Sequence, residues 1–215
     1  MTFFELHDPF RSQFFRSQYS RALAMQDLSG LLKVHWRKRM TAVAHCMTFT
    51  EIDQAFVLWG LATVVIFSLA QFSHMSWHQQ AIVDAAITGA AIANTSGLTW
   101  PIAIIARLRW VVCLWAVLMA VGVVLTTYGI FSGVGWILLN LCPLWLGLCA
   151  TGYTFMAVGM RSRCFAAAAI VHAFATFAIG HLSLYQFAGS GLVIALTLFF
   201  FSVVPWDMQA EEEAS

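Results

Sequence analysis

Apolar residues run almost without interruption from about residue 55 to residue 206, and short polar breaks divide them into six stretches. An α-helix needs roughly 20 apolar residues to cross the hydrocarbon core of a bilayer, and each stretch is of that order. The pattern therefore predicts an all-α, polytopic integral membrane protein with six transmembrane helices arranged as three hairpins. The predicted spans are 55–72, 79–106, 110–131, 134–160, 164–186 and 189–206.

Charge is scarce in this apolar region, and its distribution predicts the orientation. Of 215 residues, 60% are hydrophobic and 10% are charged, whereas a soluble domain has about 25% charged residues. Two predicted turns carry Arg107 with Arg109 and Arg161 with Arg163, while the turns between them along the chain carry neither lysine nor arginine. Because basic residues stay on the inner side of a membrane, both termini are predicted to be cytoplasmic or on the equivalent inner side.

The charge distribution also predicts three parts of the chain. Residues 1–53 form a basic cytoplasmic and juxtamembrane segment with amphipathic helices, and residues 54–206 form the six-helix bundle. Residues 207–215 form an acidic cytoplasmic tail.

A basic cluster precedes the first span, and its position predicts a contact with anionic lipids of the inner leaflet. The cluster consists of Lys33, Arg37, Lys38 and Arg39. Docking of a partner protein is the alternative interpretation of this segment. Nucleic acid is not expected as a partner, because the topology already accounts for basic residues next to a span.

The second span contains Asp84, the one acidic residue of the apolar region. On a helix this aspartate shares one side with Thr88, Ala91 and Thr95, which together form a polar stripe. Small residues recur every four positions on the opposite side and predict a helix-packing face. The residues of that face are Ala85, Gly89, Ala93 and Gly97. Because neither side suits lipid, the second span is predicted to be the central helix of the bundle.

Two prolines predict irregular helices. Pro101 cannot donate a hydrogen bond to the carbonyl of Gly97, and Pro143 has the same effect on Leu139 in the fourth span. The segment 94–101 has two interpretations. It is either an unwound segment that lines a substrate site, as in many transporters, or a proline kink whose freed carbonyl meets a neighbouring hydroxyl.

Polar stripes on spans two, four and five predict a shared polar interior that the other three spans shield. Its predicted members are Asp84, Thr88, Asn94, Thr95, Asn140, Thr151, His172 and Thr176. A carboxylate and several imidazoles near the outer boundary predict a second group that binds a cation or relays protons. Its predicted members are His74, His78, Asp84 and His181. The alternative is that Asp84 lies close enough to the boundary to reach water.

No catalytic motif and no metal-ligand spacing occurs in the sequence, so neither an enzyme nor a metal site is predicted. The five cysteines are odd in number and lack a C-x-x-C pair, which indicates buried, reduced side chains. No cofactor is required by the pattern.

Three functions remain compatible with these observations. The polar stripes favour a small-solute channel or permease. The small-residue face and the basic segment suit a non-enzymatic accessory, assembly or anchoring factor of a larger membrane complex, or a homo-oligomer. A pigment or quinone bound by a single histidine is the third hypothesis.

Overall fold

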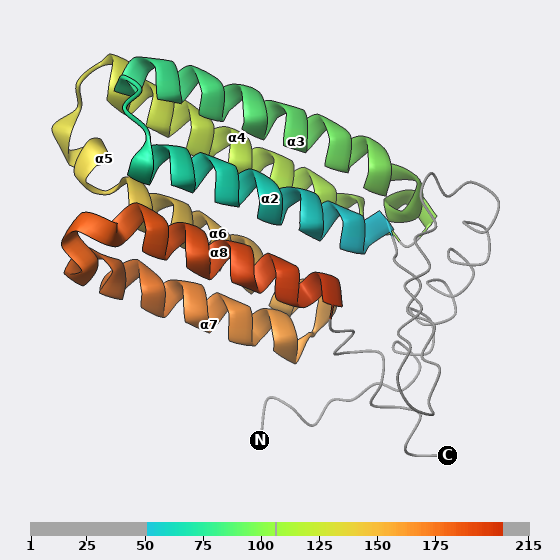
Figure 1. Cartoon of the computed structure of the whole chain (residues 1–215). Coiled ribbons are helices and arrows are strands. Elements are labelled where there is room, and N and C mark those ends of the chain that lie inside the picture. Colours follow the sequence, from blue (N-terminus) through green and yellow to red (C-terminus); the bar gives the residue numbers. More distant parts are fainter. Residues whose placement is uncertain (1–50, 106, 204–215) are drawn as a thin grey trace, which may run out of the picture.

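The computed structural model describes residues 51–105 and 107–203 of the chain (Figure 1). Within these residues the chain forms helices joined by short turns and contains no strand, so the all-α prediction is confirmed for this part. The basic cluster Lys33, Arg37, Lys38 and Arg39 and the acidic tail lie outside the described residues, and the predictions made for them stay predictions.

The helices are α2 (Glu51–Phe72), α3 (Trp77–Ile105), α4 (Arg109–Phe131), α5 (Gly135–Leu139), α6 (Leu141–Met160), α7 (Arg163–Ala178), the 3-10 helix η1 (Ile179–Tyr185) and α8 (Gln186–Val203). Four of them, α2, α3, α4 and α6, are long and apolar enough to cross a membrane, and so is the continuous run Arg163–Val203. That run folds back on itself at η1, so α7 and α8 lie antiparallel (Figure 1). These helices are compatible with a multi-pass membrane protein, while six crossings and the sidedness of the termini stay predictions.

Large apolar side chains cover the outward faces of the helices. Phe177 is 84% exposed, Leu184 81% and Leu139 78%. Apolar surface of this extent is rare on a protein surrounded by water, whereas acyl chains solvate it well. The outer surface of the bundle therefore suits a lipid environment.

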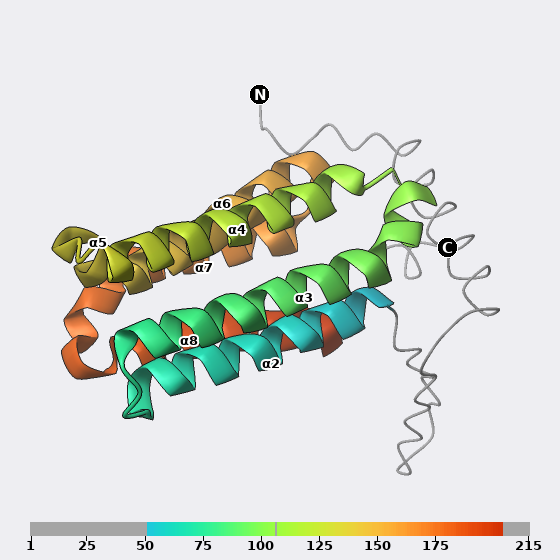
Figure 2. The ribbon, with the colours of Figure 1, turned by 90° about the horizontal axis from the view of Figure 1, so that it is seen from above.

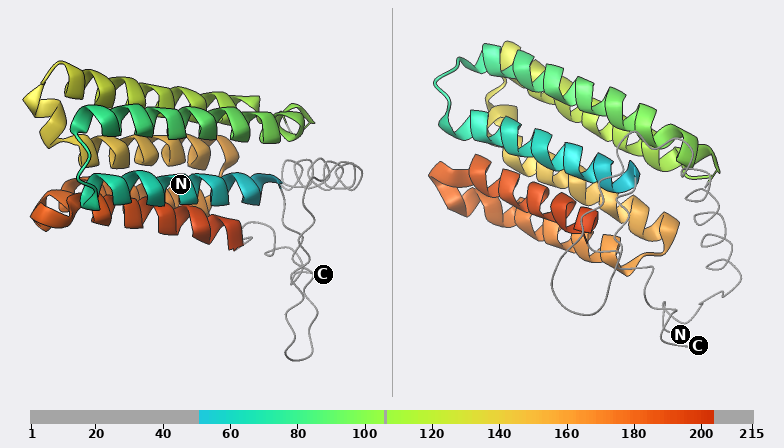
Figure 3. Two further views of the ribbon diagram at one scale, coloured as in Figure 1. Left: turned by 45° about the horizontal axis from the view of Figure 1, so that its top comes forward. Right: turned by 45° about the vertical axis from the view of Figure 1, so that its right-hand side comes forward.

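The long helices lie in two layers, with α3, α2 and α8 in one layer and α4, α6 and α7 in the other (Figures 2 and 3). The closest pairs of helices are α2 with α8, α6 with α7, and α3 with α4, the last of which joins the two layers along one edge. The middle helices of the layers are thus α2 and α6, which correspond to the first and fourth predicted spans.

The buried core follows α6. Its inward face carries Cys142, Leu146, Cys149, Tyr153 and Met156, which recur at three- or four-residue intervals and are at most 5% exposed. Aromatic rings surround Tyr153 at centroid distances of 5.0 to 6.3 Å. These rings belong to Trp115, Phe165, His172 and Phe201.

The prediction of a central second span is wrong, because α3 lies at the edge of its layer (Figure 1). Gly89, Ala93 and Gly97 are exposed, and a Cβ atom built on either glycine would meet nothing within 4 Å. Inside lipid, helices associate through packing contacts rather than through the hydrophobic effect. The large side chains of α6 offer many more such contacts than the small ones of α3, so α6 takes the interior position.

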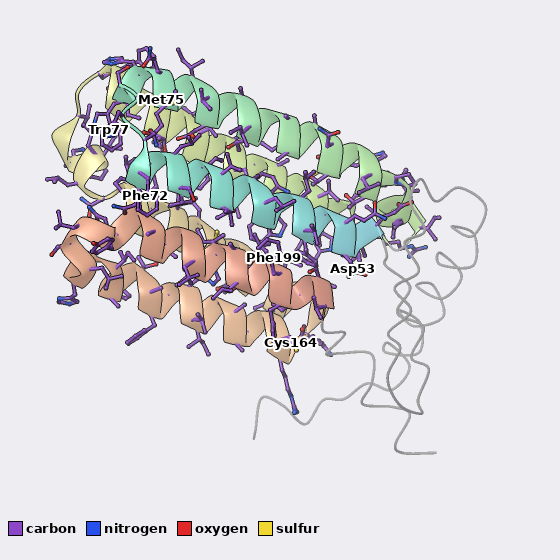
Figure 4. The ribbon with its side chains drawn as sticks, viewed as in Figure 1. Asp53, Phe72, Met75, Trp77, Cys164 and Phe199 are labelled. Atoms are coloured by element: carbon purple, nitrogen blue, oxygen red, sulfur yellow. The ribbon has the colours of Figure 1, made fainter. Side chains whose placement is uncertain are left out.

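Two glycine notches bring α2 and α8 together. Gly60 of α2 lies against the ring of Phe199 of α8 (Figure 4), and a Cβ at Gly60 would be 2.7 Å from Phe199 Cε1. Gly191 of α8 lies against Phe67 of α2 in the same way, and its Cβ would be 2.5 Å from Phe67 Cβ. Each helix thus inserts an aromatic side chain at a position where the other helix has a glycine and therefore no side chain.

The fourth predicted span is divided, which corrects its prediction as one helix over 134–160. The helix breaks at Asn140, whose φ of −114° and ψ of 19° separate α5 from α6. Pro143 lies in the first turn of α6, where a missing N–H is tolerated because that turn has no intrahelical acceptor for it. By contrast, α3 stays helical from Asn94 through Pro101, so the segment is not unwound.

Both turns of the R-x-R type close α-helices in the same way. Arg107 and Arg161 adopt left-handed φ values of 56° and 51°, and the next backbone N–H bonds to the carbonyl five residues earlier. This is the Schellman arrangement, and Ser162 in addition accepts a hydrogen bond from the Phe165 N–H at the start of α7. We call this end of the bundle, which contains Arg107, Arg109, Arg161 and Arg163, the arginine end.

The opposite end contains His74, His78 and His181, and we call it the histidine end. Ser76 and Gln79 form a capping box at the start of α3: the Gln79 N–H lies 3.4 Å from Ser76 Oγ, and the Ser76 N–H donates to Gln79 Oε1 at 3.2 Å. Met75 and Trp77 mark this end in Figure 4, and Asp53 and Cys164 mark the arginine end.

The turn between α7 and α8 corrects the predicted end of the fifth span at residue 186. Ser183 has a φ of 45° and a ψ of −98°, so the chain reverses here and α8 already begins at Gln186. Gln71 of α2 holds this turn, since its Nε2 donates to the Leu184 carbonyl at 2.8 Å and its Oε1 accepts from the Ala188 N–H at 3.2 Å.

Candidate functional site

A small cavity with a mainly apolar wall lies between the two layers near the histidine end. Its volume is about 30 Å³, and five helices, α2, α3, α4, α6 and α8, contribute to its wall. It is lined by Ile66, Phe67, Ala70, Trp77, Gln80, Asp84, Thr126, Ile130, Leu141, Trp145 and Phe187. Sites between the helices of a bundle are a common place for small ligands.

Three polar side chains face this cavity. The side chain of Gln80, which is only 6% exposed, hydrogen-bonds the Asp84 carboxyl group from one turn earlier on α3. The Oδ1 atom of Asp84 is buried and has no hydrogen-bond partner, and the same holds for Oγ1 of Thr126 on α4. Buried oxygens without partners are rare and costly, so these two atoms are the unusual feature of the cavity wall.

Thr126 differs from other threonines of the bundle. The hydroxyls of Thr95, Thr151 and Thr176 each donate to the carbonyl four residues earlier on their own helix at 2.7 or 2.8 Å. The Thr126 hydroxyl makes no such bond. Threonines in helices commonly bond back to their own backbone, so the unpaired hydroxyl of Thr126, a residue that lines the cavity, is an exception.

Aromatic rings complete the wall of the cavity. Phe67 and Trp145 come from the two middle helices, and Trp77 and Phe187 stand at the starts of α3 and α8. The last two pack against each other with centroids 5.9 Å apart and planes inclined by 48°. No lining residue is basic. The cavity therefore combines one carboxyl group, one free hydroxyl and several π systems without a counter-charge from the protein.

The residues predicted to form a polar interior do not all lie together. Thr88, Thr95 and His172 are buried and Thr176 is partly buried, but Asn94, Asn140 and Thr151 are exposed on the outside of the bundle. Asn94 and Asn140 instead donate from Nδ2 to the carbonyl four residues earlier, at 2.7 and 2.8 Å. A side chain that bonds its own helix needs no polar neighbour, which is why polar spacing on one helix overestimated the shared interior.

The predicted outer group of a carboxylate and imidazoles is not assembled. His74, His78 and His181 are exposed, and the ring of His78 packs edge-on against Phe131 at a centroid distance of 5.0 Å. His181 lies in the η1 turn rather than within a span. In residues 51–105 and 107–203, no three His, Cys, Asp or Glu side chains are placed to hold a metal ion together. Asp84 lines the cavity together with Gln80 and Thr126, and none of the three histidines is among the lining residues.

His172, one of the two histidines of the fifth predicted span, is fully buried in the core. Its Nδ1 lies 2.9 Å from the Ala168 carbonyl, its Nε2 has no partner, and the Tyr153 ring packs at a centroid distance of 5.0 Å. Carbonyls accept hydrogen bonds only, so Nδ1 carries the proton.

Gln80 and Thr126 were not predicted from the sequence as site residues. Gln80 precedes Asp84 by four residues, and that spacing places both side chains on one helix face, so a local signal existed. Thr126 lies on a different helix of an otherwise apolar stretch, and nothing in its spacing connects it to Asp84. Only the packing of α3 on α4 brings the two oxygens to one cavity.

No family model matches the chain, and no match was found among the curated proteins or the solved structures. The long apolar helices are compatible with a multi-pass integral membrane protein, and a small cavity with three polar residues in its wall lies between them.

Proposed function

We propose that this protein is a permease or channel for a small polar solute and that the Asp84 cavity is where the solute is held. The observation that supports the proposal is the pair of buried oxygens without partners, Asp84 Oδ1 and Thr126 Oγ1, beside one cavity among five helices. An ionisable side chain within a membrane helix is expensive, and such residues are generally retained for a function. Because both oxygens accept hydrogen bonds, the solute carries hydrogen-bond donors.

The route proposed for the solute, from the cavity toward the arginine end, follows the polar stripe of α3. Thr88 and Thr95 are buried and lie one and three turns beyond Asp84 on α3. The indole Nε1 of Trp59 donates to Thr95 Oγ1 at 3.2 Å, and opening of this contact would let a solute pass. With the arginine end on the inner side, as the positive-inside bias predicts, the cavity is accessible from the outer side.

Flux through proteoliposomes that contain the full chain tests this function. Stopped-flow light scattering would follow urea, glycerol and methylammonium chloride as permeants. Replacement of Asp84 by asparagine is expected to slow the transported solute at least ~10-fold, equivalent to about 1.4 kcal/mol of barrier, because the carboxylate interaction is lost. Thr151→Val is the matched control, since this exposed threonine bonds only its own helix.

Two results would contradict the proposal. Equal flux in Asp84→Asn and the unmodified protein would remove the cavity from the transport path. If all three solutes crossed the proteoliposomes no faster than protein-free liposomes, the protein would not transport them. Slower flux in Thr151→Val as well would indicate a general effect of substitution rather than a specific site.

The exposed face of α3 favours a second function, self-association as part of a membrane assembly. Gly89, Ala93 and Gly97 leave a smooth surface that no helix of the described chain covers. Asn94 lies on the same exposed side, near the middle of α3. Small residues allow backbones to approach closely in lipid, and an amide between two helices adds a hydrogen bond. We propose a second copy of this chain as the occupant of this face.

Energy transfer between labelled copies in liposomes tests self-association. Gly89→Leu is expected to weaken the association of copies at least ~10-fold by filling the face. Ala173→Leu is the matched control, because Ala173 is an exposed small residue on α7. Monomeric protein at every protein-to-lipid ratio, or equal loss in both variants, would contradict this second function.

A further inference from the structure

We infer that the Asp84 cavity binds a single ammonium-type monocation, either ammonium itself or a small primary alkylammonium. The inference rests on the proposed function where it names the solute class, but binding can be measured without transport. The charge of the cavity wall, the oxygens available to coordinate a guest and the volume of the cavity each favour this class of guest independently.

The charge of the guest follows from the surroundings of Asp84. The cavity wall contains one carboxyl group and no basic residue. In residues 51–105 and 107–203, every lysine or arginine is one of the four arginines of the arginine end, at the far end of α3 and α4 from this cavity. A carboxylate in apolar surroundings is strongly destabilised unless a cation pairs with it. The protein supplies no such cation here, and a cationic guest would.

The coordination of the guest favours ammonium over a metal cation. Asp84 Oδ1 and Thr126 Oγ1 are the lining oxygens that lack partners, and the remaining wall is mainly aromatic and aliphatic. Hard metal ions require six or more oxygen ligands, which this wall does not offer. An ammonium group donates N–H bonds to two oxygens and is stabilised at its other sides by aromatic rings. Trp77, Trp145 and Phe187 are such rings.

The size of the cavity limits the guest to about two heavy atoms. Its volume is about 30 Å³, and one water-sized group occupies about 10–15 Å³ on this scale. Ammonium and methylammonium fit within this limit. Tetramethylammonium has the same charge but five heavy atoms and no N–H donor, so it is excluded by both size and chemistry.

Fluorescence titration of the purified full chain in detergent tests the inference, because Trp77 and Trp145 line the cavity. At constant pH and ionic strength, ammonium chloride and methylammonium chloride are expected to give saturable changes, whereas sodium and tetramethylammonium chloride give none. Asp84→Asn is expected to weaken binding at least ~10-fold. Thr126→Val is expected to weaken it less, and the neighbouring Thr127→Val, which does not line the cavity, retains the affinity of the unmodified protein.

The outcomes separate the binding site from the transport function. Identical titrations with all four salts, or unchanged affinity in Asp84→Asn, would mean that water alone fills the cavity and would overturn the inference. Asp84-dependent binding without methylammonium flux in liposomes would support the site and refute transport. Flux of urea or glycerol without any methylammonium binding would support transport and refute the ammonium site.

Discussion

Replacement of Tyr153 by alanine is expected to lower the free energy of unfolding by about 2–4 kcal/mol. Tyr153 is 1% exposed and lies on α6 among rings from α4, α7 and α8. Its removal leaves a void that four aromatic neighbours cannot fill without moving. The expected loss of stability is at the lower end of the range for aromatic residues in water-soluble cores. Lipid solvates apolar side chains, so the substitution removes mainly the packing contribution of Tyr153.

Unfolding by sodium dodecyl sulfate in mixed micelles, followed by far-ultraviolet circular dichroism, measures this loss. Phe155→Ala is the matched control, since Phe155 is two residues away on α6 but 56% exposed. Its truncation removes contacts with lipid or detergent only, so a change below about 1 kcal/mol is expected. Equal destabilisation by the two substitutions would mean that α6 is not the buried centre of the bundle.

Replacement of Gly191 by alanine is expected to lower the free energy of unfolding by about 1–3 kcal/mol through overpacking. The added methyl group would lie 2.5 Å from Phe67 Cβ and 3.0 Å from Phe67 Cγ. The Phe67 Cβ does not move when the side chain changes rotamer, so a rotamer change does not remove the closer of these two contacts. Relief requires α2 and α8 to separate, which also disturbs the notch between Gly60 and Phe199.

The same micelle assay measures the effect of Gly191→Ala, and Gly89→Ala is the control. A Cβ at Gly89 would meet nothing within 4 Å, and alanine is favoured over glycine in a helix by up to about 1 kcal/mol. The two Gly→Ala substitutions are therefore expected to change stability in opposite directions. A neutral or stabilising Gly191→Ala would show that α2 and α8 do not approach as closely as described.

The structural core and the proposed site adjoin one another, and Phe67 belongs to both. The polar residues of the cavity wall, Gln80, Asp84 and Thr126, are not part of the core. Substitution of Asp84 is therefore expected to change binding or flux without a comparable loss of stability. Measuring both quantities for Asp84→Asn would separate a site residue from a packing residue.

Local chemistry made the elements of this fold predictable. The long apolar stretches predicted helices that begin and end within a few residues of α2, α3 and α4. The Arg-Leu-Arg and Arg-Ser-Arg segments marked two turns, and Asp84 stood out as an acid within a span. The exceptions were Asn140, where α5 separates from α6, and Ser183, where the chain reverses. Neither position carries a strong breaking signal such as proline.

The sequence by itself thus determined the apolar helices, the arginine turns and the one acidic position, because helix length and turn chemistry depend on neighbouring residues. Only the tertiary structure decided that α6 rather than α3 is buried, that Asn94 faces outward, and that Thr126 and Asp84 line one cavity. Lipid accommodates apolar side chains as readily as a protein interior does, so hydropathy does not distinguish an inward face from an outward one. That distinction depends on how large side chains and glycine notches of distant helices fit together.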